Sequence, residues 1–264
     1  MNDHVSKSGE TPDDAEHEPC HVGFVFAVSQ EAGGLIDRLS GAVGIGGAEF
    51  TIQEGGLAGR RVAVIVSGPG RKAARRAAEV LIAGHAPKWV VSTGFAGGLV
   101  EAVKRNEIVV AREIVDAAGV RVGVDVNDAL SGSAESAGVH VGRFVTVDEI
   151  VTTPEAKRAL GEKHGAIAVD MESLAVAEEC AREGVRCAVI RIVSDAVGDA
   201  LPAEVANLIK QKSIAGRLGA VAGAMFNRPS SIKDIYKLKE DALIASDRLA
   251  KFLESVVPRI VYAT

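Results

Sequence analysis

The sequence contains few cysteines, and their arrangement limits the kinds of site they can form. Its 264 residues include Cys20, Cys180 and Cys187, an odd number at wide spacings. This set fits neither a disulfide framework nor a zinc site built from paired cysteines. The thiols are therefore expected to be reduced, which favours a cytoplasmic location.

The sequence also has few aromatic residues and no excess of positive charge. Aromatic side chains make up 4% of the chain, and the formal net charge is −5. The chain thus offers neither a basic footprint for a phosphate backbone nor a platform for base stacking, and no nucleic-acid partner is expected. Histidines and carboxylates do not occur at the spacing of a metal cage, so neither a metal nor a cofactor is expected.

Long hydrophobic runs are absent. The longest weakly polar segment, 214–226, is interrupted by Arg217 and is too short to cross a bilayer, so no transmembrane segment is expected. Residues 1–20 are polar and acidic without the apolar centre of a signal peptide, which predicts a disordered leader. Residues 21–264 suffice for one domain with a large core.

Short β-branched runs alternate with segments of helical periodicity. This alternation predicts a single α/β domain with a central mixed, largely parallel β-sheet flanked by helices. Strands are predicted at 22–28, 61–67, 88–93, 107–115, 143–147, 165–169 and 186–193. Helices are predicted at 70–84, 154–163, 171–184 and 202–226. Pro154 and Pro202 lie near helix starts, and Gly184 is placed to end a helix.

Two further segments have distinct patterns. Residues 231–257 carry apolar side chains along one stripe of an amphipathic helix, which is expected to dock on the domain. An interfacial or partner-binding helix is the alternative. Residues 117–140 are rich in glycine and serine and show little periodicity, which predicts a surface connection that could act as a lid.

Three carboxylates follow predicted strands. Glu31 comes after the first strand, Glu172 after the sixth and Asp195 after the seventh. Each alone is explained by a helix cap, a first-turn charge or a turn. However, ligands of open α/β sheets bind at the carboxyl ends of strands, where these three side chains would meet. Together they predict a cleft for acid/base chemistry.

Two glycine-rich stretches give weaker evidence for a binding site. The stretch TGFAGGL at 93–99 lacks the G-x-G-x-x-G spacing of a dinucleotide site, and SGPGRKAARRA at 67–77 lacks the P-loop spacing. The first is expected to be a tight turn that lets a ligand approach the backbone closely. The second is expected to be a plain turn from strand to helix.

Four motifs carry a family resemblance: FAVSQEAGGL, STGFAGGL, AVDMESLAVAEEC and VIRIVSDAVGD, in this order between about residues 22 and 200. Together they resemble the nucleoside phosphorylase/nucleosidase superfamily, most closely its methylthioadenosine/S-adenosylhomocysteine nucleosidase-like branch. The resemblance implies an enzyme that hydrolyses the N-glycosidic bond of a 5′-substituted adenosine and releases adenine. It also implies that the small-molecule substrate is a purine nucleoside and that the protein is a homodimer.

The resemblance also assigns roles to residues. Asp195 would protonate N7 of the leaving base, with Ser194 orienting its carboxyl group, and Glu31 would activate the attacking water. Met171 and Glu172 would hold the ribose. The remaining contacts to sugar and base are expected from Phe95, Ala96, Gly97, Ile150 and Val151.

Some residues depart from the pattern of the family. Phe95 stands where a small residue is common, and Ser92 stands where phosphorylases of the superfamily carry an arginine. Hydrolysis is therefore favoured over phosphorolysis. Because Arg71 could still bind an anion, a phosphate-dependent purine nucleoside phosphorylase remains an alternative. A non-catalytic nucleoside-binding protein is another.

The 5′ group of the substrate is left open by the sequence. The connection 117–140 is shorter than the segment that encloses this group in related nucleosidases. The tail from Asn227 onward resembles the hopanoid-associated nucleosidases, which release adenine from adenosylhopane. That resemblance implies a roomy apolar pocket for the 5′ group and peripheral membrane contact through the C-terminal helix.

Overall fold

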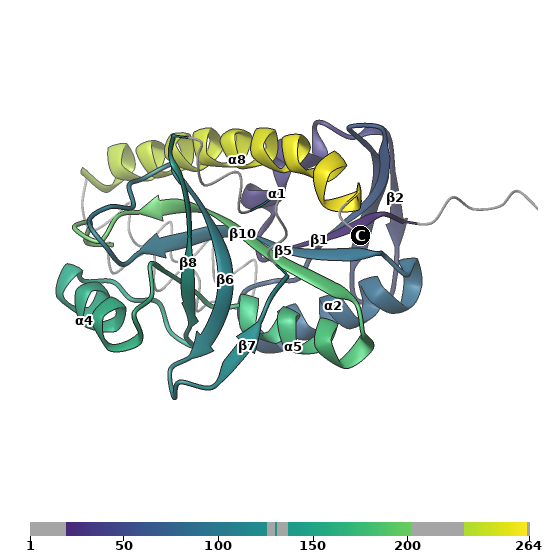
Figure 1. Ribbon diagram of the computed structural model, residues 1–264. Helices are drawn as coiled ribbons and strands as arrows, with labels where there is room; N and C mark the ends of the chain where they lie inside the picture. The colour runs from purple at the N-terminus through teal and green to yellow at the C-terminus, as the bar shows by residue number, and fades with distance from the viewer. Residues whose placement is uncertain (1–19, 126–129, 131–136, 202–229, 263–264) are drawn as a thin grey trace, which may run out of the picture.

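The computed structural model describes residues 20–125, 130, 137–201 and 230–262. They form a ten-stranded β-sheet flanked by helices (Figure 1). Five strand pairings are parallel and five are antiparallel, so the sheet is mixed. The predicted helix 202–226 and residues 1–19 of the predicted leader lie outside the described residues.

The strands are β1 (Val22–Phe26), β2 (Ser40–Gly46), β3 (Thr51–Leu57), β4 (Arg60–Val66), β5 (Trp89–Gly98), β6 (Ile108–Asp116), β7 (Arg121–Gly123), β8 (Val139–Thr146), β9 (Ala168–Asp170) and β10 (Arg186–Asp195). The helices are α1 (Ser29–Ile36), α2 (Arg71–His85), α4 (Pro154–His164), α5 (Ser173–Glu183) and α8 (Ser230–Tyr262). All seven predicted strands are present, as are the predicted helices within the described residues. Pro154 begins α4, and Gly184 ends α5 in the left-handed conformation.

The sheet runs in the order β10-β6-β8-β9-β5-β1-β4-β3-β2. Since β10 also pairs with β5, the strands β5, β9, β8, β6 and β10 close on themselves. The parallel strands β1, β4, β5 and β10 end on the same side of the sheet. That shared edge is where the segments after β1, β5 and β10 come together.

Two predictions differ from the structure, and one hairpin was missed. The stretch 93–99 is largely strand and not a tight turn, because β5 continues to Gly98 by pairing with β9 and β10. The hairpin β2–β3 was not predicted, since β2 is glycine-rich and exposed along its whole length. The segment 117–140 is not all irregular, because β7 pairs with β6 and β8 already begins at Val139. Residues 126–129 and 131–136 lie outside the described residues.

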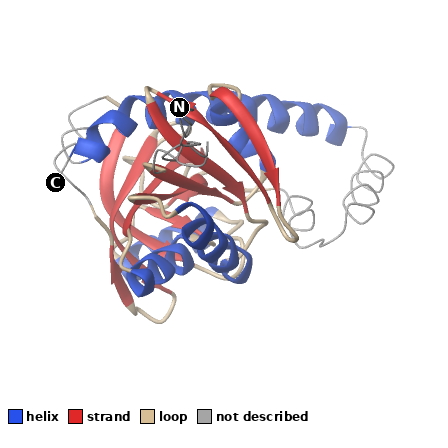
Figure 2. Ribbon diagram, turned by 90° about the vertical axis from the view of Figure 1, so that its right-hand side faces the viewer, coloured by secondary structure: helices blue, strands red, loops and turns tan. Residues whose placement is uncertain are grey.

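Helices cover both faces of the sheet. Helix α2 buries Ala74, Ala77, Ala78 and Leu81, a helical spacing of small apolar residues, and packs beside α5. On the opposite face lie α1 and α8, as the turned view shows (Figure 2). The two layers bury separate sets of apolar side chains against the same strands.

Helix α8 docks on the domain, as the amphipathic pattern predicted. It lies along α1 and packs on β10, and its buried side chains include Leu249, Leu253, Val257 and Ile260. Leu243 and Ile244 remain exposed beside this stripe. No helix among the described residues combines the length and the apolar composition needed to cross a membrane.

Candidate active site

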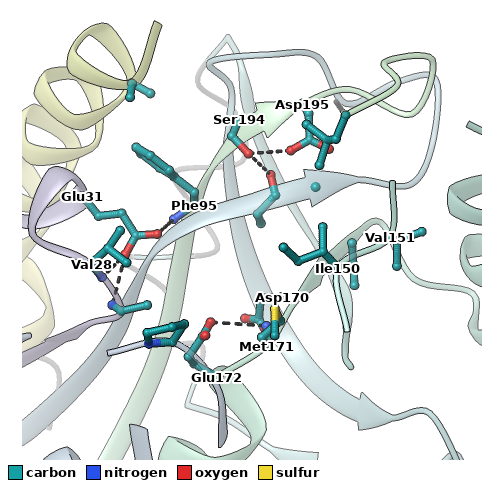
Figure 3. A pocket seen from close by; sticks show the side chains of 18 of the residues that line it. Val28, Glu31, Phe95, Ile150, Val151, Asp170, Met171, Glu172, Ser194 and Asp195 are labelled. Carbon is teal, nitrogen blue, oxygen red and sulfur yellow. Dashed lines mark hydrogen bonds between the residues drawn. The ribbon is translucent and has the colours of Figure 1, made fainter. Parts of the chain in front are cut away.

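The carboxyl ends of β1, β5 and β10 surround a cavity of about 300 Å³. All ten residues to which the resemblance gives a role line it. Figure 3 labels them, except for Ala96 and Gly97. They come from five places in the chain: Glu31 in α1, the 95–97 end of β5, Ile150 and Val151 before α4, Met171 and Glu172 before α5, and Ser194 and Asp195 at the end of β10. Within the described ranges, no three His, Cys, Asp or Glu side chains gather as metal ligands would.

Glu31 is buried and held by the backbone. Its Oε2 accepts hydrogen bonds from the N–H groups of Ala27 (3.0 Å) and Val28 (3.1 Å), and its Oε1 accepts one from Phe95 (2.9 Å). Burial raises the pKa of Glu31, although the positive charge of Arg191 and the three N–H donors oppose this effect. The carboxylate therefore has one orientation and more basic character than an exposed glutamate.

Helix α8 fixes the helix that carries Glu31. The Ser246 hydroxyl donates to the carbonyl oxygen of Glu31 and accepts from the N–H of Gly34, both at 3.0 Å. A Cβ on Gly34 would lie 2.8 Å from the carbonyl oxygen of Ser246, so only glycine permits this approach. The C-terminal helix thus supports the cavity wall from behind.

Glu172 occupies the N-cap position of α5. Its Oε1 accepts from the N–H of Gly70 (2.8 Å) at the start of α2, and its Oε2 accepts from the N–H of Met171 (3.3 Å). Burial raises the pKa of Glu172 to about 7; nearby Asp170 adds to the rise and Arg191 opposes it. Near neutral pH this group therefore exchanges its proton readily.

A buried arginine lies under the cavity. Arg191 is 1% exposed and donates to the carboxylate of Asp170 (3.1 Å), the carbonyl oxygen of Thr93 (2.9 Å) and the hydroxyls of Ser92 (3.1 Å) and Ser173 (2.9 Å). Asp170 is therefore engaged in this ion pair, and its Oδ1 also accepts from the N–H of Ser173. The positive charge of Arg191 also acts on Glu31 and Glu172, where it opposes the rise in pKa, although Arg191 donates no hydrogen bond to either carboxyl group.

Gly94 separates these charged groups. Its φ of +137° favours glycine, and a Cβ there would lie 2.6 Å from Oε2 of Glu31 and 2.9 Å from Nη1 of Arg191. The absence of a side chain allows the guanidinium and the carboxylate to approach the same point of β5. Gly94, which the sequence suggested would let a ligand approach the backbone, lets the side chains of Glu31 and Arg191 approach it instead.

Asp195 faces the cavity from the end of β10. The register between β10 and β5 shifts between Val193 and Asp195, so the irregularity at Ser194 redirects the carboxyl group. Its Oδ1 accepts from the hydroxyl of Ser194 (2.6 Å), and its Oδ2 contacts the ammonium group of Lys157. The acid predicted from the sequence is thus held at both oxygens.

The features that suggested phosphate binding are used within the protein. Arg71 donates to the carbonyl oxygen of Thr146 (2.8 Å) and pairs with Asp148 (3.0 Å). The N–H of Gly70 points at Glu172, as described above, so the first donor of α2 is bound to a carboxylate. Ser92 accepts a hydrogen bond from Arg191, which comes from a neighbouring strand. A phosphate anion would have to displace these partners.

Sequence reasoning missed Arg191 and Lys157. The signal for Arg191 was an arginine inside the apolar run CAVIRIV, where an unpaired charge would be costly. Lys157 gave no such signal, because it lies in a helix with several other charges and only the fold shows that it points inward.

Comparisons with known proteins show the family to which the chain belongs. A family model of the phosphorylase superfamily matches residues 21–217. The 5′-methylthioadenosine/S-adenosylhomocysteine nucleosidase of Shewanella putrefaciens is 30% identical over 208 residues, which cover 69% of this chain and 89% of the relative.

Solved structures show the same fold. The nucleosidase of that name from Helicobacter pylori, with butyl-thio-DADMe-Immucillin-A, has a TM-score of 0.70 at 20% identity and covers 91% of this chain and 99% of its own. Futalosine hydrolase from the same organism also has a TM-score of 0.70 at 20% identity, covering 92% and 99%. With the matching family model and the 30% identical relative, we conclude that the chain belongs to the phosphorylase superfamily, in its 5′-methylthioadenosine/S-adenosylhomocysteine nucleosidase branch.

Proposed function

We propose that this protein is a purine nucleosidase that hydrolyses the N-glycosidic bond of a 5′-substituted adenosine and releases adenine. The observation that carries the proposal is the placement of three buried carboxyl groups, Glu31, Glu172 and Asp195, around one cavity. Its relatives, which are nucleosidases by name, support the same reaction.

Asp195 is the proposed general acid. A purine anion is a poor leaving group, so protonation of N7 must accompany cleavage of the bond between C1′ and N9. The hydroxyl of Ser194 fixes one oxygen of the carboxyl group and leaves the group directed into the cavity. The apolar side chains of Ile150 and Val151 line the same part of the cavity and offer a surface for the base.

Glu31 and Glu172 are proposed to act on the sugar. As the base leaves, positive charge develops on the ribosyl group, and carboxylates in a buried site stabilise that charge. Glu31, whose pKa is raised by burial, accepts a proton from the attacking water. Glu172 binds ribose hydroxyls, and Met171 packs beside it.

Adenine release from methylthioadenosine and S-adenosylhomocysteine tests the reaction. Asp195→Asn is expected to lower kcat by roughly 10²- to 10⁴-fold, because it removes the acid with little change in volume. The control Asp37→Asn changes an exposed residue at the end of α1 and should leave kcat unaltered. Near-normal turnover by Asp195→Asn, or no turnover of any nucleoside by the natural protein, would defeat the assignment; the latter would favour the binding-protein alternative.

Phosphate dependence separates the hydrolase from the phosphorylase. The engagement of Arg71, Gly70 and Ser92 within the protein supports hydrolysis. Turnover should therefore be unchanged when phosphate is removed, and the sugar product should be the free ribose that still carries the 5′ substituent. A strict requirement for phosphate, with the 1-phosphate of that substituted ribose as product, would show phosphorolysis.

We infer that the 5′ substituent is apolar. Beyond Phe95 the cavity reaches Val28 and the α8 residues Ala242 and Ala245, which are apolar and small. Methylthioadenosine and an adenosine with a large 5′-hydrocarbon, as in adenosylhopane, are the apolar candidates, and S-adenosylhomocysteine, whose 5′ group ends in a charged amino acid, is the polar alternative. Ala245→Phe should lower kcat/KM for the large apolar substrate more than for methylthioadenosine. Equal effects on both would place the 5′ group elsewhere.

We also infer a homodimer in the cytoplasm. Family resemblance supports the dimer, and three unpaired buried cysteines are consistent with a reducing compartment. Exposed Leu243 and Ile244 on α8 are the residues that support peripheral membrane contact. Light scattering measures the mass in solution, and vesicle flotation of Leu243→Asp beside the natural protein measures the contact.

A further inference from the structure

The ammonium group of Lys157 is fully buried next to Asp195. Lys157 projects from α4, its side chain is 0% exposed, and its Nζ contacts Oδ2 of Asp195. Nζ also donates to the carbonyl oxygens of Ala196 (3.0 Å) and Asp199 (2.8 Å). Two of the three N–H donors of the lysine are engaged by these carbonyl oxygens, and the ammonium forms an ion pair with Oδ2 of Asp195. A buried ammonium is costly unless it is paired and hydrogen-bonded, and here it is both.

The ammonium is the only charged group in direct contact with Asp195 among the described residues. From the segment after β10, the carboxylate of Asp199 accepts from the N–H of Ala196 and pairs with Arg105 (3.0 Å). From β9, Asp170 pairs with Arg191.

On the side of β5 the neighbour of Asp195 is Gly97, where a Cβ would lie 3.2 Å from Oδ2. The charge at Lys157 therefore acts on Asp195 more strongly than any other charge in the site.

We propose that Lys157 is the positioning residue for the acid, an inference that rests on the proposed function. When the proton on the Asp195 carboxyl group moves to N7, the bond between C1′ and N9 breaks and its electron pair goes to the base. A carboxylate remains on Asp195. The ammonium of Lys157 stabilises that carboxylate as it forms and, together with Ser194, holds it in one orientation.

One consequence distinguishes this role from simple packing. Loss of the ammonium should slow only those reactions in which the leaving group needs the acid. A packing defect would instead reduce all activities together.

The test compares two leaving groups in the same preparation. Lys157→Met retains the length of the side chain and removes its charge, and Lys157→Gln retains N–H donors for the two carbonyl oxygens. The substrates are methylthioadenosine, which needs protonation at N7, and 4-nitrophenyl β-D-ribofuranoside, whose phenolate leaves without it. Lys163→Met, at an exposed position of the same helix, is the control.

The expected result is a loss of roughly 10- to 100-fold in kcat for methylthioadenosine, with little loss for the nitrophenyl riboside. Because the ratio of the two activities does not depend on the folded fraction, a partly folded variant still reports it. An unchanged ratio in both Lys157 variants overturns the proposal. Failure of the natural protein to cleave either substrate refutes the proposed function instead.

Discussion

The carboxyl group of Glu172 connects the electrostatics of the site to the stability of the fold. Its pKa is about 7 in the folded protein, against an ordinary value of 4.5, because the group is buried. Between these two pH values the folded state holds a proton that the unfolded state has released. The free energy of unfolding must therefore fall as pH rises from about 4.5 to about 7, and level off above that.

The magnitude follows from the same values. A difference of about 2.5 pH units corresponds to roughly 3 kcal/mol above pH 7. Glu172→Gln removes this cost and retains an oxygen for the N–H of Gly70. The weaker bond from Met171 is lost, at about 1 kcal/mol. The variant should therefore be more stable by about 1–3 kcal/mol at alkaline pH and should lose that advantage near pH 4.5.

Urea unfolding of both proteins, from about pH 4.5 to about pH 8.5, measures this difference. Glu31, whose pKa is also raised, is present in both and cancels to first order. Glu162→Gln, at an exposed position of α4, is the control. A Glu172→Gln difference that does not vary with pH, or one that grows as pH falls, would refute the electrostatic reasoning.

Two substitutions test the groups beneath the cavity. Gly94→Ala should destabilise the protein by roughly 2 kcal/mol or more, since the new Cβ would meet Glu31 at a φ that favours glycine, and thermal unfolding beside Gly59→Ala, where the space is open, measures this. Arg191→Met should cost about 3–5 kcal/mol because it leaves Asp170 buried without its partner. Adding Asp170→Asn should recover part of that loss in urea unfolding, and an additive double variant would contradict the coupling.

The parts of the fold that depend on local pattern could be predicted from the sequence. The seven strands that were predicted are short, apolar and rich in β-branched residues, and the predicted helices carry an apolar stripe or end at a glycine. The hairpin β2–β3 was missed because its first strand is an exposed edge with little pattern. The length of β5 was missed because glycines in a strand are read as turns, whereas pairing with both β9 and β10 keeps them extended here.

The site divides in the same way. Strand ends and motif order predicted the carboxylates of Glu31, Glu172 and Asp195, because a parallel sheet brings such ends to one edge. The carboxylate partners of the two buried cations, Arg191 and Lys157, could not be predicted. Each reaches its carboxylate from a different element, and such contacts depend on tertiary packing and on no spacing along the chain.

Ser92 differs from the arginine that the resemblance places at this position in a phosphorylase, and the residues around Ser92 differ with it. Its buried hydroxyl accepts from Arg191 of β10, so a guanidinium already lies beside the position on β5 where the resemblance places the arginine of a phosphorylase. Ser92→Arg would place a second guanidinium against the first in a packed space and should destabilise the protein by roughly 3 kcal/mol or more.

Ser92→Ala, the matched control, should cost about 1.5–3 kcal/mol through one lost hydrogen bond to a charged group. Thermal unfolding and phosphate-dependent turnover measure the outcome. A Ser92→Arg protein that folds as stably as the natural one and gains phosphorolysis would show that the site separates the two reactions by a single side chain. If the Ser92→Arg protein unfolds more easily and gains no phosphorolysis, the packing of Arg191 from β10 against Ser92 is what prevents this site from binding phosphate as a phosphorylase does.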